Sequence, residues 1–270
     1  MTLLQSILLG ILQGLTEFLP ISSSGHLVLI PHLLGWNIYP EDAYLFDVLV
    51  QVATLAAVFA YFWKDLWQIG NAFARGLVAR QPFQGHAAAL GWYLILATIP
   101  AGLLGLLLKD AVETAFSSPR AAGGFLLITA VLLIAAERIG TRNRTFEELT
   151  WRDTLWMGFA QALAIFPGVS RSGATITGGM TRNLNRQSAA RFSFLMSIPI
   201  MLAAGLLASL DLLQTPNLSS RLLVYLPGFA AAAITGYLSI RWLLGYLTRR
   251  PLYGFAIYCI VLGIIGLLVG

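Results

Sequence analysis

The chain has 270 residues, of which 57% are hydrophobic and only 11% are charged, and its mean hydropathy is +0.76. Because soluble domains carry about 25% charged residues, this composition excludes a soluble globular fold and indicates a polytopic membrane protein. The net charge of +5 is therefore interpreted as a matter of membrane topology and not of nucleic-acid binding. The single cysteine, Cys259, excludes an internal disulfide, and one cysteine with three histidines offers few ligands for a zinc or iron–sulfur site.

In chain order, the sequence predicts six membrane-spanning helices. A span needs about 20 predominantly apolar residues. Six apolar runs of about this length lie near 44–63, 88–108, 121–139, 188–210, 221–243 and 252–269.

Two further apolar segments are interrupted by polar clusters. The first consists of 3–19 and 27–35 on either side of Pro20, and the second of 154–166 and 174–181 on either side of Pro167. Each pattern predicts a short helix, a polar break and a second short helix, as in a re-entrant hairpin. Such a break at membrane depth is tolerated where protein buries it or where it lines a wet cavity.

The two interrupted segments are copies of each other. A shift of 148 positions places Gln13 on Gln161, Ser22 on Ser170, Ser24 on Ser172 and Gly25 on Gly173. A hairpin followed by three spans occurs twice, which predicts a duplication within one integral membrane domain, with repeat one at 1–140 and repeat two at 150–270. Three spans are an odd number, so the second repeat starts on the opposite face. The expected fold is an all-α polytopic membrane protein with six transmembrane helices and two re-entrant helical hairpins in two inverted repeats, which places a site near the bilayer midplane.

Loop charge predicts the orientation. Arg and Lys are concentrated after the first span, around the second hairpin and after the fifth span, whereas the alternate loops hold only Lys109, Arg120 and Arg221. By the positive-inside rule the first group is cytoplasmic. The first hairpin then enters from outside and the second from inside, so that their tips can meet, and the site is expected to be reached from the periplasmic side.

The polar residues of the first hairpin suit phosphate chemistry. Gln13 and Glu17 are four positions apart, on one face of the first short helix. Beyond Pro20, Ser22 to Gly25 begin the next helix, and a helix N-terminus binds phosphate through free N–H groups and the positive end of its dipole. An ionisable residue at membrane depth costs roughly 3 kcal/mol, so Glu17 is expected to have a function. It could hold a divalent cation against the phosphates, or act in protonated form as a general acid.

The second hairpin repeats this pattern with Ser170, Arg171, Ser172 and Gly173. The planar guanidinium of Arg171 can donate two hydrogen bonds to phosphate oxygens. Two opposed helix N-termini and one arginine therefore predict an anion pocket.

Ser23 and His26 lie three positions apart on the first turn of a predicted helix. A hydroxyl and an imidazole this close could form a nucleophile–base pair. The alternatives are structural: the serines and glycines could serve as helix caps and close-packing points, and Glu17 could form a buried ion pair with Arg171.

These motifs resemble those of the undecaprenyl-diphosphatases, also called bacitracin-resistance proteins. The first match is a Glu/Gln-x-x-x-Glu element, here Gln13 to Glu17, followed by Pro20 and Ser-Ser-Ser-Gly-His, and the second is Pro-Gly-x-Ser-Arg-Ser-Gly-Ala-Thr, unbroken from Pro167 to Thr175. The resemblance covers essentially the whole length. It implies an integral enzyme of the bacterial inner membrane that removes the terminal phosphate of undecaprenyl diphosphate. The product, undecaprenyl phosphate, is the lipid carrier for peptidoglycan precursors. Dependence on a divalent cation (Mg²⁺ or Ca²⁺) and a role in bacitracin resistance are also implied.

The resemblance further implies roles for individual residues. Positions that the family uses in catalysis are occupied by Glu17, Ser23, His26 and Arg171, and phosphate-site positions by Ser22, Ser170 and Thr175. We add Gln13, Ser172 and Gly173 to the expected substrate-binding set, and Glu17 is the expected metal ligand. Gln13 stands where many members have Glu, which counts against a metal site with two carboxylates.

The predicted function is hydrolysis of a polyprenyl diphosphate, with Ser23 as attacker and His26 as base or acid. An activated water is the alternative attacker. The expected partners are undecaprenyl diphosphate and the membrane, not nucleic acid, and a homodimer is left open. The rival function is a secondary transporter or flippase of an anionic lipid, because inverted repeats with broken helices are typical of transporters. An intramembrane serine protease is a weaker rival, since Arg171 beside Ser170 favours phosphate over a peptide.

Overall fold

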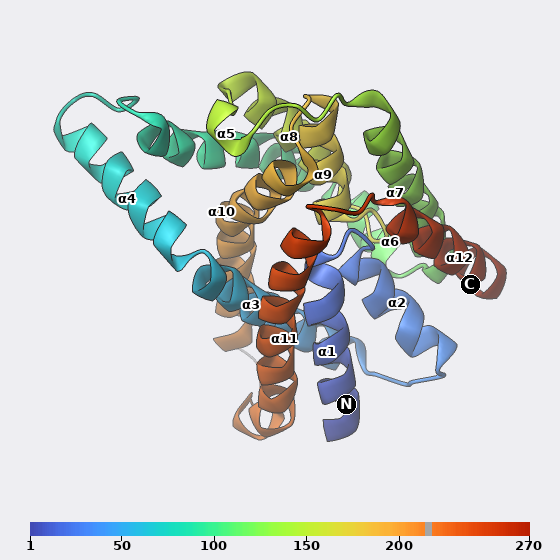
Figure 1. Ribbon diagram of the computed structural model, residues 1–270. Coiled ribbons are helices and arrows are strands. Elements are labelled where there is room, and N and C mark those ends of the chain that lie inside the picture. The colour runs from blue at the N-terminus through green and yellow to red at the C-terminus, as the bar shows by residue number, and fades with distance from the viewer. Residues whose placement is uncertain (214–217) are drawn as a thin grey trace.

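The computed structural model describes residues 1–213 and 218–270, and this part of the chain is built from helices (Figure 1). In chain order they are α1 (Leu3–Phe18), α2 (Ser23–Leu33), α3 (Pro40–Tyr61), α4 (Trp63–Val78), α5 (His86–Leu107), α6 (Lys109–Phe116), α7 (Pro119–Ile139), the 3-10 helix η1 (Phe146–Glu148), α8 (Trp151–Leu163), α9 (Arg171–Thr181), α10 (Arg186–Leu213), α11 (Leu218–Tyr246) and α12 (Tyr253–Val269). Each apolar segment that the sequence predicts as a helix coincides with one of them, so the all-helical fold is confirmed.

Five described helices are long and apolar enough to cross a membrane: α3, α5, α7, Arg186–Leu206 of α10 and Arg221–Tyr246 of α11. The expected sixth span forms α12, which is apolar but has 17 residues, slightly fewer than a straight crossing needs.

Two helices, α4 and α6, were not predicted. A single residue separates each of them from the end of a spanning helix. In α4 the side chains of Trp63 and Trp67 are more than 60% exposed, whereas Ile69 and Gly76 are buried. Helices with one buried and one exposed face are found at membrane interfaces. The polar residues of α4 favour a loop when the sequence is considered alone.

Both predicted hairpins form as two short helices joined by a proline-containing turn. The helix α1 ends at Phe18 because Pro20 disfavours helical backbone at the residue before it, and Leu19 is extended (φ −64°, ψ 140°). The helix α8 ends at Leu163, ahead of a turn in which Gly168 adopts a φ of 103°, a conformation that glycine adopts without strain.

Glycines let each short-helix pair pack closely against a long helix of the other half. The helix α1 lies against α11, and α8 lies against α5. Gly10 of α1 meets the backbone of Gly228, and a Cβ on Gly158 of α8 would lie 2.8 Å from the carbonyl oxygen of Ala97. Because small residues allow helix backbones to approach this closely, both positions require glycine. Gly10 and Gly158 are themselves 148 positions apart, which is the same shift that aligns the two polar clusters.

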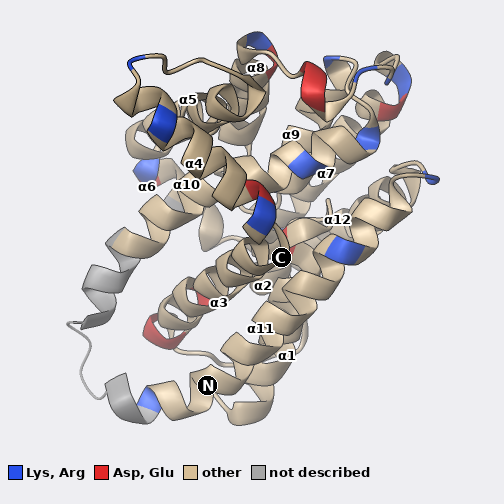
Figure 2. Ribbon diagram, turned by 60° about the vertical axis from the view of Figure 1, so that its left-hand side comes forward, with Lys and Arg blue, Asp and Glu red and all other residues tan. Residues whose placement is uncertain are grey.

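Charged residues gather around α8 and the ends of α7 and α9, and few lie near the N-terminus of α1 (Figure 2). In the first turn of α8, outside the spanning helices, the fully buried Asp153 accepts hydrogen bonds from Arg144 and Arg182 at 2.7 to 3.1 Å. Burial alone would raise the pKa of Asp153, but hydrogen bonds from Arg144, Thr150 and Arg182 lower that pKa from 3.8 to about 2. These contacts fix the start of the second short-helix pair.

Candidate active site

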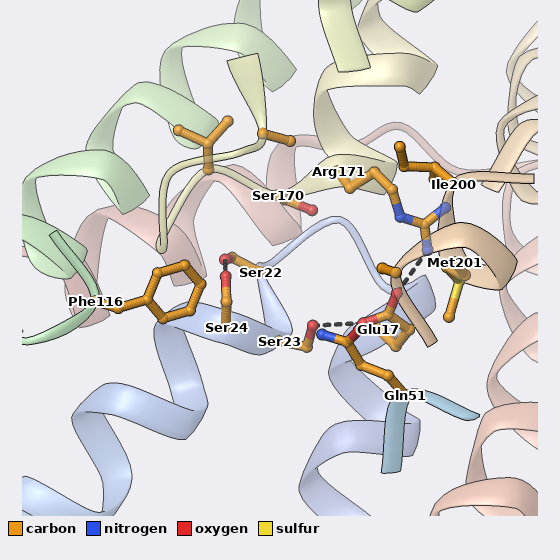
Figure 3. A pocket seen from close by; sticks show the side chains of 13 residues that line it. Glu17, Ser22, Ser23, Ser24, Gln51, Phe116, Ser170, Arg171, Ile200 and Met201 are labelled. Carbon is orange, nitrogen blue, oxygen red and sulfur yellow. Dashed lines mark hydrogen bonds and ion pairs between the residues drawn. The ribbon is translucent and has the colours of Figure 1, made fainter. Parts of the chain in front are cut away.

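The turns of the two short-helix pairs meet, and the N-termini of α2 and α9 line one cavity (Figure 3). Ser22 Oγ accepts a hydrogen bond from the N–H of Gly25 (3.2 Å), and Ser170 Oγ accepts one from the N–H of Gly173 (3.0 Å). The same serine cap is therefore built twice, once at the start of each helix that lines the cavity. The first amides of each helix have no intrahelical carbonyl to bond, so both helix ends can donate to an anion.

The cavity has a volume of about 180 Å³, which equals the liquid volume of about six water molecules. Its polar lining consists of Glu17, Ser22, Ser23, Ser24, Gln51, Ser170 and Arg171, and its apolar lining of Phe116, Ala164, Val169, Ile200, Met201 and Ala204. Polar donors beside an apolar wall suit an amphiphile, with its headgroup among the donors and its chain along the wall.

Glu17 is the centre of the polar lining. Its Oε1 accepts a hydrogen bond from Arg171 Nη2 at 2.7 Å, which is also an ion pair. Its Oε2 accepts from Ser23 Oγ at 2.6 Å and from Gln13 Nε2 at 3.0 Å. The carboxylate thus links the catalytic candidates of the two short-helix pairs.

Within the described residues, two buried atoms of this cluster have no hydrogen-bond partner. They are Nη1 of Arg171 and Oε1 of Gln13. A buried polar atom without a partner costs about 1–3 kcal/mol, and more if it is charged. The free Nη1 lies on a side chain that lines the cavity, so an anion in the cavity would satisfy it.

Four of the six predicted substrate-binding residues do not line the cavity. Gln13 donates to Glu17 from α1, and Ser172, Gly173 and Thr175 lie in α9. Ser172 Oγ lies 3.1 Å from Ser170 Oγ and 3.1 Å from the Leu19 carbonyl oxygen, to which it donates, joining the two turns. The buried Thr175 lies 2.6 Å from Ser193 Oγ, and a Cβ on Gly173 would crowd Ser170. These residues support the N-terminus of α9, while Ser22 and Ser170 line the cavity itself.

Ser23 and His26 have different partners. Ser23 points to Glu17, whereas the fully buried His26 ring lies between the carbonyl oxygen of Ser22 and the hydroxyl of Tyr258, both at 2.7 Å. The two residues share a helical turn, but their side chains leave it on different sides.

Sequence reasoning did not single out Gln51, Phe116 or Tyr258. The sequence does contain a signal for Gln51, because this residue is a lone amide within an apolar run. Phe116 and Tyr258 lie among similar apolar and aromatic residues, and only the fold brings them to the cavity or to His26.

The fold and the site define a multi-pass helical membrane protein with a polar cavity between two pairs of short helices. The family model described as "Bacitracin resistance protein BacA" matches residues 6–265. The chain therefore belongs to the bacitracin resistance protein BacA family.

Curated relatives are similar over nearly the whole length. A protein of Thermomicrobium roseum is 45% identical, with 100% of this chain and 98% of that protein aligned. One of Chlorobaculum tepidum is 44% identical (100% and 97% aligned), and one of Myxococcus xanthus is 41% identical (98% and 88% aligned). Each of these relatives is named undecaprenyl-diphosphatase.

Proposed function

We propose that this protein is an undecaprenyl-diphosphate phosphatase, which releases inorganic phosphate and leaves undecaprenyl phosphate in the membrane. The single observation that carries the proposal is the unpartnered, buried Nη1 of Arg171 in a cavity lined by two helix N-termini. The relatives' shared name supports the same activity. No contact in the site favours the rival transporter.

The terminal phosphate binds between the two serine-capped helix ends. The guanidinium of Arg171 donates through Nη1, and the first amides of α2 and α9 donate from either side. As charge develops on the transferring phosphoryl group, these fixed donors stabilise it. The polyprenyl chain leaves the cavity along Phe116, Ile200 and Met201 toward the lipid.

Ser23 is the proposed attacker and Glu17 its proton acceptor, because the two oxygens are 2.6 Å apart. Ser23 Oγ bonds to the terminal phosphorus while the bond from that phosphorus to the bridging oxygen breaks. The hydroxyl proton passes to Glu17, and undecaprenyl phosphate leaves. Water then hydrolyses the phosphoserine and releases phosphate. Direct attack by a water held at Glu17 is the alternative, and the variants described in the Discussion separate the two.

The proposal includes a divalent cation, Mg²⁺ or Ca²⁺. Among the described residues no three His, Cys, Asp or Glu side chains lie together, so the protein alone does not form a metal cage. Mg²⁺ commonly binds through one or two carboxylates together with substrate phosphates. Glu17 and the unpartnered Oε1 of Gln13 fit such a shared site. The cation would offset the charge of the diphosphate.

For the membrane arrangement, we infer two inverted repeats, at 1–140 and 150–270, with α12 as the sixth span and the α1–α2 and α8–α9 pairs as re-entrant hairpins. The matching glycine contacts of α1 and α8 support the duplication. The gathering of Arg around α8 supports a cytoplasmic location for that end in the inner membrane (Figure 2). The cavity then opens toward the periplasm.

The test is phosphate release from a C55 diphosphate by purified protein in detergent, with Mg²⁺ or Ca²⁺ and with chelator. Transport needs two compartments, whereas hydrolysis does not, so turnover in detergent separates the two functions. Glu17→Gln is the matched control, because it keeps the shape of the side chain and removes its charge. A folded wild type that releases no phosphate with either cation would overturn the proposal.

A further inference from the structure

The two serine caps differ in backbone strain. Ser22 has φ 68° and ψ 99°, whereas Ser170 has φ −69° and ψ 119°. A non-glycine residue held at positive φ typically costs about 1–3 kcal/mol, and it persists only where its surroundings enforce it. Both hydroxyls perform the same capping task, so the cap itself does not require the strain. Something else must hold Ser22.

The His26 ring makes the contact that can do so. A carbonyl oxygen only accepts, so the 2.7 Å contact with the Ser22 carbonyl places a proton on Nδ1. In the neutral ring Nε2 then accepts from the Tyr258 hydroxyl at 2.7 Å, and the two rings are nearly parallel, with 4° between their planes. Tyr258 therefore fixes the orientation and the tautomer of a fully buried ring.

The second helix pair serves as an internal comparison. The position equivalent to His26 is Ala174, which has no side chain to hold the serine carbonyl. There the N–H of Ser170 donates to Thr129 Oγ1 at 2.9 Å, and the backbone is relaxed. The imidazole and the strained serine thus occur together in one pair and are both missing from the other.

We propose that Tyr258 and His26 form a clamp that holds the Ser22 backbone and so positions the Ser23 hydroxyl on Glu17. In this arrangement His26 and Tyr258 are positioning residues. His26 does not line the cavity, and its two ring nitrogens are occupied by Ser22 and Tyr258. The clamp rests on the proposed phosphatase function and adds Tyr258 to its machinery.

Two substitutions of His26 separate a clamp from a base. The amide nitrogen of Asn reaches the place of Nδ1, so His26→Asn keeps the bond to the Ser22 carbonyl. The longer His26→Gln reaches the place of Nε2 and loses that bond. Because a misplacement of about 1 Å can cost about a hundredfold in rate, we expect His26→Gln to lose about a hundredfold in kcat and His26→Asn to stay within about tenfold of wild type. KM should change little in either. Equal losses in the two folded variants would overturn the clamp.

Tyr258→Phe tests the other end of the clamp and changes only one oxygen. We expect a several-fold loss of kcat at unchanged KM. In a Ser22→Gly background, where glycine adopts the positive φ without strain, the same substitution should cost less. An equal loss in both backgrounds would contradict the clamp, even though Ser22→Gly lowers activity by itself.

A measurement without turnover keeps the clamp and the phosphatase function distinguishable. ¹⁵N spectra of histidine-labelled protein, with His26→Asn to assign the signal, should show the tautomer that is protonated on Nδ1. If the wild type releases no phosphate, the phosphatase function fails while this spectrum still tests the clamp. A proton on Nε2 of the neutral ring would overturn the clamp whatever the activity.

Discussion

Glu17 and Arg171 are 154 positions apart in the sequence, and their side chains form an ion pair of 2.7 Å inside the candidate active site. This contact was foreseen only as a structural alternative to a functional site. In the structure the two nitrogens of the Arg171 guanidinium allow both interpretations, the ion pair and the phosphate contact. Nη2 of Arg171 holds the carboxylate, and Nη1 has no partner in the described part of the chain.

Arg171→Lys should lower kcat about a hundredfold, because a lysine keeps the charge but loses the two-pronged geometry. Phosphate release by purified protein, together with thermal unfolding, measures the effect. Arg191→Lys is the matched control, since Arg191 pairs with Asp65 outside the cavity. It should turn over at a rate near wild type. A folded Arg171→Lys variant as active as this control would exclude a phosphate clamp at Arg171.

Ser23→Ala should lose nearly all hydrolysis and Ser24→Ala only a small part. Ser23 Oγ bonds to Glu17, whereas Ser24 Oγ bonds to Ser22 Oγ. Glu17→Gln should be as severe as Ser23→Ala, and the double variant scarcely worse, as for residues that act as a unit. Rates at saturating substrate and cation decide. If Ser23→Ala kept substantial activity while Glu17→Gln did not, a water molecule would be the attacker.

Gln13→Glu should strengthen cation binding. Within the described part of the chain the Oε1 of Gln13 has no partner, and the side chain bonds to Glu17 through Nε2. A second carboxylate raises the charge offered to the cation. We expect the half-saturating Mg²⁺ or Ca²⁺ concentration to fall about tenfold. A cation titration of phosphate release after chelation measures it, with the exposed Gln68→Glu as control. An unchanged titration would remove Gln13 from the cation site.

Asp153→Asn should destabilise the fold by about 2 kcal/mol, since it breaks a buried pair whose arginines are partly exposed. The folded-state pKa of Asp153, about 2, lies below its usual 3.8. The stabilisation is therefore fully present above about pH 4 and is lost as the pH falls toward 2. Thermal unfolding in detergent at a series of pH values tests this. A difference between wild type and variant that persists unchanged at pH 2 would contradict the assignment.

A cysteine at position 23 should report the orientation of the cavity. Ser23→Cys should react with a small aqueous thiol reagent added from outside, and a diphosphate analogue should block the reaction. The native Cys259 is fully buried and should stay unlabelled. Gln187→Cys, at the exposed start of α10, should react only from the cytoplasm. Labelling of Ser23→Cys from the cytoplasmic side alone would reverse the orientation inferred from loop charge.

The helices could be read from the sequence because apolar length and proline position are local signals. Pro20 and Pro167 predict breaks after residues 19 and 166, and the structure has both breaks, but α8 ends at Leu163, three residues earlier than predicted. The helix α4 was not predicted, because its polar residues mask an apolar face.

Side-chain pairing at the site was harder to foresee. Spacing alone placed Ser23 near His26, but in the structure Ser22 has a positive φ and the Ser23 hydroxyl bonds to Glu17. The ring of His26 meets Tyr258, which lies 232 positions away. A contact of this kind depends on how α12 packs, and no local pattern encodes it.

The hydrogen bond from Ser172 to the Leu19 carbonyl has a consequence for how the protein loses activity. The proposed nucleophile Ser23 and the carboxylate of Glu17 belong to one half of the chain, and the guanidinium of Arg171 belongs to the other. The proposed active site therefore lies at the boundary between the two halves. A harsh detergent that loosens this boundary would leave every helix intact and still abolish turnover. Circular dichroism would then show unchanged helix content, and phosphate release would be the more sensitive measure of whether the two halves are still joined.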